Sequence, residues 1–313
     1  MTSKATASQD NSNVHIDITT LVRLRHHAHG FSFLPRQPVH SLLSGRKRSR
    51  LRGRGLDFEE LRHYRPGDDI RTMDWRVTNR TGKPHVRVYT EERDRPVVLV
   101  VDQRLSMFFG SKLKMKSVMA AELAALSAWQ VLRQNDRVGA ILFNDDEIEQ
   151  IKPARSQRSL MALLSRLTRM NRNLKVDNSS SSRPSQLPAA LLQAERMAGH
   201  DYLFVIISDF DGWNDEAMAA VKRMAQHNDL IAGLIYDPLE EDITPASELV
   251  VSDGQYQLML DPQKKNLGER FQAQFRSRLA VLQQELRKHG MPVLPINTVE
   301  PVFDQLRTRL GPH

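Results

Sequence analysis

Apolar residues in this chain form two kinds of pattern, short continuous runs and longer stretches with helical spacing. The runs at 97–101 and 202–207 are rich in β-branched and aliphatic residues, as in strands that are buried on both faces. In the stretch 112–133 apolar residues recur every three or four positions, which predicts a helix. By the same criteria we expect further strands at 137–143, 148–151, 230–236 and 292–296, and helices at 159–169, 187–198, 216–226, 268–289 and 302–310.

Strands and helices alternate from residue 96 to residue 313. This order predicts a doubly wound, mostly parallel sheet with helices on both faces, that is, a three-layer α/β fold. Residues 249–251 and 256–260 are expected to form a hairpin at an edge of the sheet. Ligands of such sheets bind beyond the carboxyl ends of the strands, beside the point where the strand order reverses. The residues that follow each strand are therefore the first candidates for a site.

The residues before 96 lack this alternation. Residues 1–29 are expected to form a partly disordered tail, because 1–15 are rich in Ser, Asn, Thr and Ala, with one or two helical turns at 16–24. Residues 30–95 are predicted to form a small β-rich module, with short strands at 71–75 and 85–91 and a turn at Pro66-Gly67-Asp68.

Composition is ordinary for a soluble globular protein, with 40% hydrophobic and 26% charged residues. The chain contains no cysteine, which excludes disulfides and thiolate chemistry. No apolar run approaches the roughly 18 residues that span a bilayer, and the polar N-terminus lacks the apolar segment of a signal peptide. We therefore expect a cytoplasmic protein without a membrane segment. No feature of the sequence predicts its oligomeric state.

Positive charge is concentrated at the start of the chain. Residues 1–96 hold 19 Lys and Arg against 11 Asp and Glu, whereas residues 97–313 hold 26 of each, so the net charge of +8 lies before the α/β domain. The basic run 46–54 consists of Arg46, Lys47, Arg48, Arg50, Arg52 and Arg54. Such a run is compatible with nucleic acid or another anionic surface. A solvated loop or a patch that faces an acidic partner is favoured, since no aromatic residue interleaves with the basic residues.

Oxygen-bearing side chains follow the buried strands. The first buried strand is followed by Asp102 and Ser106, the strand at 202–207 is followed by Asp209, and Ser185 precedes a predicted helix. Carboxylate and hydroxyl oxygens from three loops suit a hard cation such as Mg²⁺. An Asp at a strand end can also simply cap the following loop. The start of the helix after the first loop is expected to expose Lys112, Lys114 and Lys116.

A second set of polar residues surrounds the turn at Gly67. Arginine alternates with aspartate over residues 62–76, which favours a network of ion pairs that fixes a compact module. No nucleophile or paired general acid and base stands among these residues, so a structural role is favoured over catalysis. A hydrolase with Asp68, Asp69 and Asp74 as metal ligands is the remaining catalytic hypothesis.

The strand-end residues resemble the metal-ion-dependent adhesion site of von Willebrand factor A domains. That family uses an Asp-x-Ser-x-Ser sequence, a Thr from a later loop and an Asp after the fourth strand. Asp102 matches the first Asp and Ser106 the second Ser, while Ser185 stands at the Thr position and Asp209 at the last Asp. The resemblance implies a three-layer fold and, in an intact site, a metal ion whose shell is completed by a carboxylate of the partner.

Arg104 departs from this pattern, because it occupies the position of the first Ser, which in the family binds the metal directly. A guanidinium cannot ligate a cation and repels Mg²⁺ at close range. We therefore expect a degenerate site in which Mg²⁺ is disfavoured and Arg104 lies between Asp102 and Asp209 as an internal cation. A partner carboxylate is then expected to meet Arg104. The binding face is expected to consist of the loops 102–111, 183–187 and 208–214.

The segment 53–75 resembles the signature of the bacterial family called domain of unknown function 58. In that family, Gly-x-Gly-x-x-Phe and Arg-x-Tyr-x-Pro-Gly-Asp-Asp-x-Arg-x-x-Asp-Trp directly precede a von Willebrand factor A-like domain. The resemblance covers about residues 40–240. The matching positions are Gly53, Gly55, Phe58, Arg62, Tyr64, Pro66, Gly67, Asp68, Asp69, Arg71, Asp74 and Trp75.

This resemblance implies a function without catalysis. It implies that the chain works with a MoxR-type AAA+ ATPase, as an adaptor or in chaperone-like assembly of complexes. We therefore expect a non-enzymatic protein-interaction module. The alternative is a protein that binds nucleic acid or another anion through the basic run 46–54, which a steeply salt-dependent gel shift would reveal.

Overall fold

The computed structural model describes residues 13–29, 31, 56–91, 95–175, 182–243, 249–252, 257–260 and 267–311. The basic run 46–54 and the first 12 residues, which were expected to be disordered, lie outside these ranges. The chain divides into two compact units, one of Met1–Leu34 with Arg95–His313 and one of Pro35–Asp94. We refer to them as the α/β unit and the small unit, and each is described by itself.

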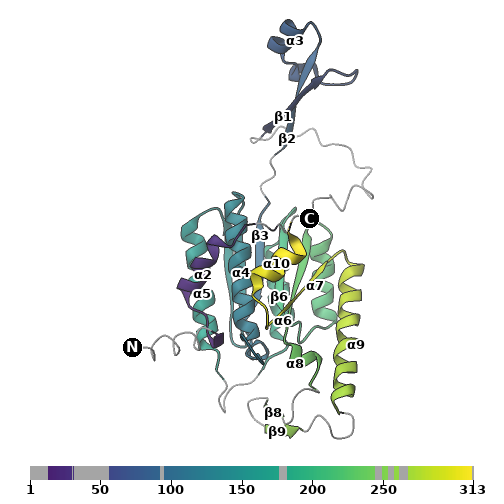
Figure 1. The fold of residues 1–313 in the computed structure, drawn as a ribbon. Helices are drawn as coiled ribbons and strands as arrows, with labels where there is room; N and C mark the ends of the chain where they lie inside the picture. Colours follow the sequence, from purple (N-terminus) through teal and green to yellow (C-terminus); the bar gives the residue numbers. More distant parts are fainter. Residues whose placement is uncertain are drawn as a thin grey trace. The chain divides into compact units, whose positions relative to one another are not determined.

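The α/β unit, shown in Figure 1, is built around a central sheet. This sheet has six strands in the order β10-β7-β6-β3-β4-β5. All neighbouring strands are parallel except β4 and β5. In chain order the six strands therefore run 3-2-1-4-5-6, the order of a doubly wound sheet, which confirms the predicted fold class. The strands are β3 (Val97–Asp102), β4 (Val138–Phe143), β5 (Ile148–Ala154), β6 (Leu203–Ser208), β7 (Asp229–Tyr236) and β10 (Val293–Asn297).

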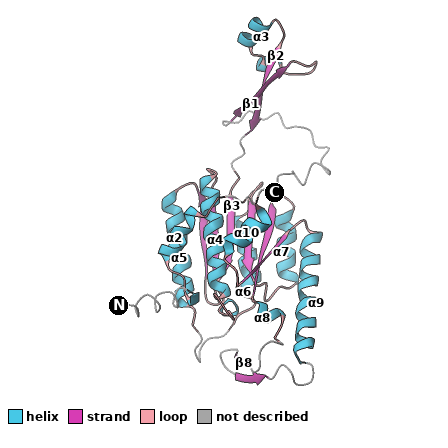
Figure 2. Ribbon diagram, in the orientation of Figure 1, coloured by secondary structure: helices cyan, strands magenta, loops and turns pink. Residues whose placement is uncertain are grey.

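Helices cover both faces of this sheet (Figure 2). Alternate residues of β3 belong to opposite cores: Val97, Leu99 and Val101 pack with α4, α5 and α10, whereas Val98 and Val100 pack with α6, α7 and α9. This alternation is what a strand between two helical layers requires. The helices are α4 (Lys116–Arg133), α5 (Gln157–Asn173), α6 (Gln186–Met197), α7 (Asp215–Ala225), α8 (Pro238–Glu241), α9 (Leu267–Lys288) and α10 (Val302–Leu310).

The predicted elements of the α/β unit are present, with ends that differ by a few residues. Only the position of the hairpin of β8 (Leu249–Ser252) and β9 (Gln257–Leu260) differs from the prediction. It was expected at an edge of the central sheet, but it forms a separate two-stranded sheet, and the edges of the central sheet are β5 and β10. Among the described residues, no helix combines the length and the apolar character needed to cross a bilayer.

Part of the segment that was expected to be a tail lies in the core of the α/β unit. Ile16 and Leu21 are fully buried, and Leu21 belongs to the short helix α2 (Ile18–Arg23). The indole of Trp129 on α4 donates a hydrogen bond of 3.0 Å to the carbonyl of Leu21. Asp17 caps α2 by accepting from the backbone N–H of Thr20. Buried apolar contacts therefore attach this segment to the outer face of α4.

The small unit contains an antiparallel pair, β1 (Leu56–His63) and β2 (His85–Glu91), joined by a helical connection. The prediction of a strand at 71–75 is wrong. Residues Ile70–Thr72 form a 3₁₀ turn and Trp75–Thr81 form the helix α3. The physical reason is capping: the side chains of Asp69 and Asp74 accept backbone N–H groups at the starts of these two elements.

Candidate functional site

Asp102 ends β3 at the carboxyl edge of the sheet, next to β6, where the strand order reverses. Its side chain is fully buried. One carboxylate oxygen accepts the backbone N–H of Arg104 at 2.9 Å, and the other accepts the hydroxyl of Ser208 at 2.6 Å. These donors, together with the Arg104 guanidinium, satisfy an ionised carboxylate. Burial raises the pKa of Asp102, and the charge of Arg104 opposes this shift.

The guanidinium of Arg104 is fully buried beside Asp102. Its Nε lies 3.0 Å from Oδ1 of Asp102 and its Nη2 lies 2.6 Å from Oδ2, so the pair is bidentate. Nη2 also donates to the carbonyl of Asp211 at 3.0 Å, and Nη1 donates to the carbonyl of Pro184 at 3.4 Å. The carbon of the guanidinium lies 5.5 Å from the centre of the Phe143 ring. All three guanidinium nitrogens therefore have partners inside the chain.

This arrangement overturns one expectation from the sequence. We expected the carboxylate of a partner to meet Arg104, but the guanidinium is buried and its donors are used by Asp102, Asp211 and Pro184. A further carboxylate would have to displace one of these bonds and enter a closed space. Arg104 is therefore a structural cation that holds three loops together, and it does not offer a surface for recognition.

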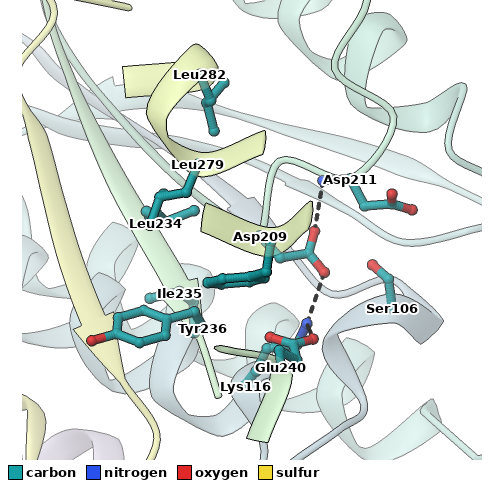
Figure 3. A pocket seen from close by; sticks show the side chains of 11 residues that line it. Ser106, Lys116, Asp209, Asp211, Leu234, Ile235, Tyr236, Glu240, Leu279 and Leu282 are labelled. Atoms are coloured by element: carbon teal, nitrogen blue, oxygen red, sulfur yellow. Dashed lines mark hydrogen bonds and ion pairs between the residues drawn. The ribbon is translucent and has the colours of Figure 1, made fainter. Parts of the chain in front are cut away.

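Asp209 follows β6 and lies between two cations. Its Oδ1 is 3.5 Å from Nη2 of Arg104. Its Oδ2 is 3.1 Å from Nζ of Lys116, as Figure 3 shows. The backbone N–H of Asp211 also donates to Oδ1 at 3.0 Å. Burial acts to raise the pKa of Asp209, but Lys116 and Arg104 outweigh it and lower the pKa to about 2. Asp209 is therefore ionised at any physiological pH.

Lys116 is a site residue that was expected to be exposed and is buried. It was expected at the exposed start of a helix, but its side chain is only 3% exposed. Its Nζ lies 2.5 Å from Oε1 of Glu240 and 3.1 Å from Asp209. Burial alone would lower the pKa of Lys116, but these two carboxylates raise it above its ordinary value. A lysine in the first turn of a helix opposes the helix dipole, which is a signal that it needs carboxylate partners.

The two serines of the predicted site lie in different surroundings. Ser106 is in the 3₁₀ turn Leu105–Met107, and its Oγ is buried without a hydrogen-bond partner among the described residues. Ser106 lines the same cavity as Asp209. Ser185 precedes α6 and is exposed, and its hydroxyl does not cap that helix. The structure therefore brings Asp102, Arg104 and Asp209 into one network, with Ser106 beside it and Ser185 outside it.

The residues at this edge do not fit Mg²⁺. The position that would hold a ligand in an intact adhesion site holds Arg104, whose charge repels a divalent cation and whose side chain fills the space beside Asp102. Lys116 places a second positive charge on Asp209. Within the described parts of the chain, no three His, Asp or Glu side chains are grouped as metal ligands. Two internal cations therefore satisfy the carboxylates that a metal would bind.

Neighbouring loops are fixed to this network by short hydrogen bonds. The carboxylate of Asp145, in the turn between β4 and β5, accepts the backbone N–H of Leu105 and that of Arg183, both at 2.6 Å. A Cβ atom on Gly212, which has a φ of +82°, would lie 2.2 Å from the carbonyl oxygen of Pro184, so only glycine allows this approach of the two loops. The loops after β3, β4 and β6 therefore form one connected surface.

In the small unit, aspartates of the 62–75 signature bind nearby backbone and arginines. Arg62 forms a bidentate pair with Asp68, with both N–O distances at 2.8 Å. Asp68 also accepts the backbone N–H of Arg65, and Gly67 adopts a φ of +106° in the same turn. The hydrogen bonds from Arg62 lower the pKa of Asp68.

The second half of the signature is organised by Asp74. This carboxylate caps α3 and lies 2.7 Å from Nη2 of Arg87 on β2. The pKa of Asp74 is lowered by the backbone hydrogen bonds that it accepts at the start of α3 and by the hydrogen bond from the Arg87 side chain. Tyr64 is joined by its backbone N–H to the carbonyl of Pro84 at 2.9 Å. Two other residues of the signature, Arg71 and Trp75, lie exposed, Trp75 to 60%. Asp69 caps the 3₁₀ turn. Asp68, Asp69 and Asp74 therefore all accept hydrogen bonds from nearby backbone, which is what residues that fix turns are expected to do.

Fold and site together define a von Willebrand factor A-like α/β unit, with a buried network of carboxylates and internal cations at the carboxyl edge of its sheet, preceded in the chain by a small arginine- and aspartate-rich unit. The sequence model of the family described as "Protein of unknown function DUF58" matches residues 60–281. The chain belongs to this family. It is 28% identical over 274 residues to the uncharacterized protein Rv1480 of Mycobacterium tuberculosis, with 84% of this chain and 81% of that protein covered.

Solved structures similar to this chain include two bacterial proteins. One is the conserved hypothetical protein BatB from Bacteroides thetaiotaomicron, with a TM-score of 0.42 and 14% identity, covering 68% of this chain and 96% of that chain. The other is a von Willebrand factor type A protein from Catenulispora acidiphila, with a TM-score of 0.38 and 12% identity, covering 71% of this chain and 43% of that chain.

Proposed function

We propose that the α/β unit is a protein-interaction module that binds its partner at the carboxyl edge of the sheet without a metal ion. The position of Arg104 carries this proposal. Its guanidinium satisfies Asp102 and approaches Asp209, in the place where an intact adhesion site would hold its cation. Groups of the chain itself therefore hold Asp102 and Asp209 and connect the loops at this edge.

Exposed apolar side chains on the first of these loops support a role in recognition. Phe109 and Leu113 are each 38% exposed in the segment between β3 and α4. Aromatic and aliphatic side chains of this kind are the usual anchors of protein–protein interfaces. They lie in the chain next to residues that the buried network fixes, so a partner would meet a surface that is already ordered.

For the partner, we propose a MoxR-type AAA+ ATPase, on the basis of the family resemblance alone. In this proposal the chain serves as an adaptor or assembly factor in the cytoplasm and has no catalytic role of its own. Its contribution is to present the carboxyl edge of the sheet to the ATPase or to the complex on which the ATPase acts.

The test is binding between the full chain and a purified MoxR-type ATPase from the same species. We expect saturable binding by biolayer interferometry in at least one of the ATP, ADP and nucleotide-free states. Phe109→Asp is expected to weaken it at least tenfold, because a charge replaces an apolar contact. The matched control is Val281→Asp on α9, an equally apolar position that is 58% exposed, which should bind as the wild type does. Absence of binding in all three states would contradict the partner.

A calorimetric titration with Mg²⁺ and Mn²⁺ tests the metal-free part of the proposal. Wild-type protein is expected to show no binding below millimolar metal concentrations, because Arg104 and Lys116 already pair with Asp102 and Asp209, the carboxylates that would bind the metal. Arg104→Ser, which restores a hydroxyl at that position, is the matched variant. Micromolar affinity of the wild type for Mg²⁺ would show that this account of Arg104 is wrong.

A further inference from the structure

A cavity of about 250 Å³ opens beside the buried network, between the carboxyl edge of the sheet and α9 (Figure 3). Pockets for small organic ligands are usually larger, roughly 300 Å³ or more. The size of this cavity suits one long side chain. The following inference rests on the proposed function, because it names the chemical group of the partner that enters the binding face.

The polar side of the cavity carries excess negative charge. Asp209, Asp211 and Glu240 line it, and the one ammonium group that lines it belongs to Lys116. That ammonium is already used, since it lies 2.5 Å from Glu240 and 3.1 Å from Asp209. Arg104 does not line the cavity; it pairs with Asp102 and lies 3.5 Å from Asp209. With Asp211 left out of the count, the three carboxylates of Asp102, Asp209 and Glu240 still exceed the two cations by one negative charge, which favours a cationic occupant.

The opposite side of the cavity is apolar. Leu234 on β7 and Phe275, Leu279 and Leu282 on α9 contribute to its wall. Figure 3 shows Leu279 and Leu282 on α9 on one side of the cavity and Asp209 on the other. An occupant that matches both sides has an aliphatic stem with a positive group at its end. Lysine and arginine have this structure, since their methylene stems pack on apolar surface while the charged end stays in polar surroundings.

Ser106 supplies an independent observation at the same place. Ser106 lines the cavity, and its Oγ is buried and has no hydrogen-bond partner among the described residues. A buried hydroxyl without a partner costs free energy unless a ligand completes it. A hydroxyl oxygen accepts hydrogen bonds, and ammonium and guanidinium groups only donate them. A basic group in the cavity would therefore satisfy Ser106 and the carboxylates together.

We propose that this cavity receives a lysine or arginine side chain of the partner protein. Recognition then has the opposite polarity to an intact adhesion site, in which the metal attracts an acidic residue. This polarity follows from the buried cations: Arg104 and Lys116 are enclosed in the chain, and the three carboxylates of Asp102, Asp209 and Glu240 outnumber them. A partner carboxylate placed in the cavity would face Asp209 and Glu240 and would be repelled.

A pair of variants at Leu279 tests the charge preference without any ligand. Leu279→Lys places a basic group at the apolar wall of the cavity, and Leu279→Glu places an acidic group of similar length there. Both remove the same apolar side chain, so their common effect on packing cancels in the comparison. We expect Leu279→Glu to unfold at least about 3 °C below Leu279→Lys, a shift that thermal unfolding resolves easily. Equal stability, or the reverse order, would overturn the proposal.

A titration with model compounds tests binding itself. N-acetyl-arginine methylamide is compared with its uncharged citrulline analogue and with N-acetyl-glutamate methylamide, by calorimetry at millimolar concentrations on the full chain. We expect the arginine compound to bind at least tenfold more tightly than the other two. Glu240→Gln should weaken it at least fivefold, whereas Glu216→Gln, an exposed residue in the first turn of α7, should not change it. Preference for the glutamate or citrulline compound would overturn the proposal.

The two proposals fail separately. If the arginine compound binds but no ATPase binds, the partner class is wrong and the polarity of the cavity stands. If the ATPase binds and Phe109→Asp weakens it, but the arginine compound does not bind and Glu240→Gln leaves the ATPase affinity unchanged, then the interaction module stands. In that case the cavity is not the place where the partner inserts a basic side chain.

Discussion

The two units of this protein use the same residue types, aspartate and arginine, in opposite surroundings. At the carboxyl edge of the α/β sheet, Asp102 and Arg104 are fully buried and Asp209 is 9% exposed. In the small unit, Arg62 is 33% and Arg87 is 48% exposed. Both regions show bidentate or near-bidentate pairs with N–O distances below 3 Å. The ion pairs of the two units therefore have similar hydrogen-bond geometry and differ in how deeply they are buried.

This difference changes what each ion pair does for the fold. An exposed pair contributes about 0–1 kcal/mol, because water solvates the charges almost as well as the partner does. A buried pair has lost that water, so removal of one partner leaves a charge that nothing compensates. We infer that the small unit uses its pairs to fix turns, while the α/β unit depends on its network to keep two carboxylates at the edge of the sheet.

The largest expected effect is that of Arg104→Ala. It leaves the buried carboxyl of Asp102 with only backbone and Ser208 donors and no cation, and it removes the contacts to Pro184 and Asp211. Removal of one partner of a buried pair costs about 3–5 kcal/mol. We expect a loss of that size in the free energy of unfolding, measured by urea denaturation of the full chain. The double variant Asp102→Asn with Arg104→Met should recover much of it, because no unpaired charge remains.

A loss below about 1 kcal/mol for Arg104→Ala would mean that this pair behaves like an exposed one. Burial would then not make this pair stronger than the exposed pairs of the small unit. The proposal that Arg104 takes the place of a metal cation would also be wrong. If the double variant is no more stable than Arg104→Ala, the loss of stability comes from lost packing and not from an unpaired charge.

The second prediction concerns pH and Asp209. Its pKa in the fold is about 2, below the ordinary value of 3.8. A lowered pKa means that the ionised form stabilises the fold above about pH 4 and that this contribution is lost as the pH falls toward 2. Its full size is about 2 kcal/mol by linkage. We expect the stability difference between wild type and Asp209→Asn to shrink between pH 5 and pH 3 in urea denaturation.

The wild type and Asp209→Asn are measured side by side at each pH. A difference that stays constant between pH 5 and pH 3 would show that Lys116 and Arg104 do not hold the Asp209 carboxylate in its ionised form.

The sheet and its helices could be predicted from the sequence because their signals are local. Continuous apolar runs mark buried strands and helical spacing marks covering helices. The helix α3 was missed because its start is set by a cap: Asp74 accepts two backbone N–H groups and bonds to Arg87 on β2. That last contact joins residues far apart in sequence, and periodicity does not report it.

The site was predictable only where chemistry restricts the choice. A guanidinium next to Asp102 must pair or be solvated, so a position for Arg104 beside the carboxylates followed from its residue type. Lys116 and Glu240 come from different elements, the first turn of α4 and the short helix α8, and are joined only by folding. Ser185 matched the adhesion-site pattern in order along the chain, but it lies exposed at the start of α6.

The smallest expected effect is that of Arg62→Ala in the small unit. The Arg62–Asp68 pair is bidentate at 2.8 Å, which favours a contribution at the upper end of the range for exposed pairs. Both side chains nevertheless contact solvent, and Asp68 keeps the backbone N–H of Arg65 as a donor. We expect a local cost of at most about 1 kcal/mol. Amide exchange of β1 and β2 in the full chain should therefore accelerate by no more than about fivefold.

Asp74→Ala is the matched comparison for Arg62→Ala, because it removes a cap in addition to an ion pair in the same unit. Loss of an N-cap alone costs about 1 kcal/mol, and Asp74 is only 8% exposed on its side chain. Exchange in α3 should therefore accelerate more after Asp74→Ala than exchange in β1 does after Arg62→Ala. If Arg62→Ala had the larger effect, burial of the carboxylate would not set the strength of these pairs, because Asp68, at 20%, is more exposed than Asp74, at 8%.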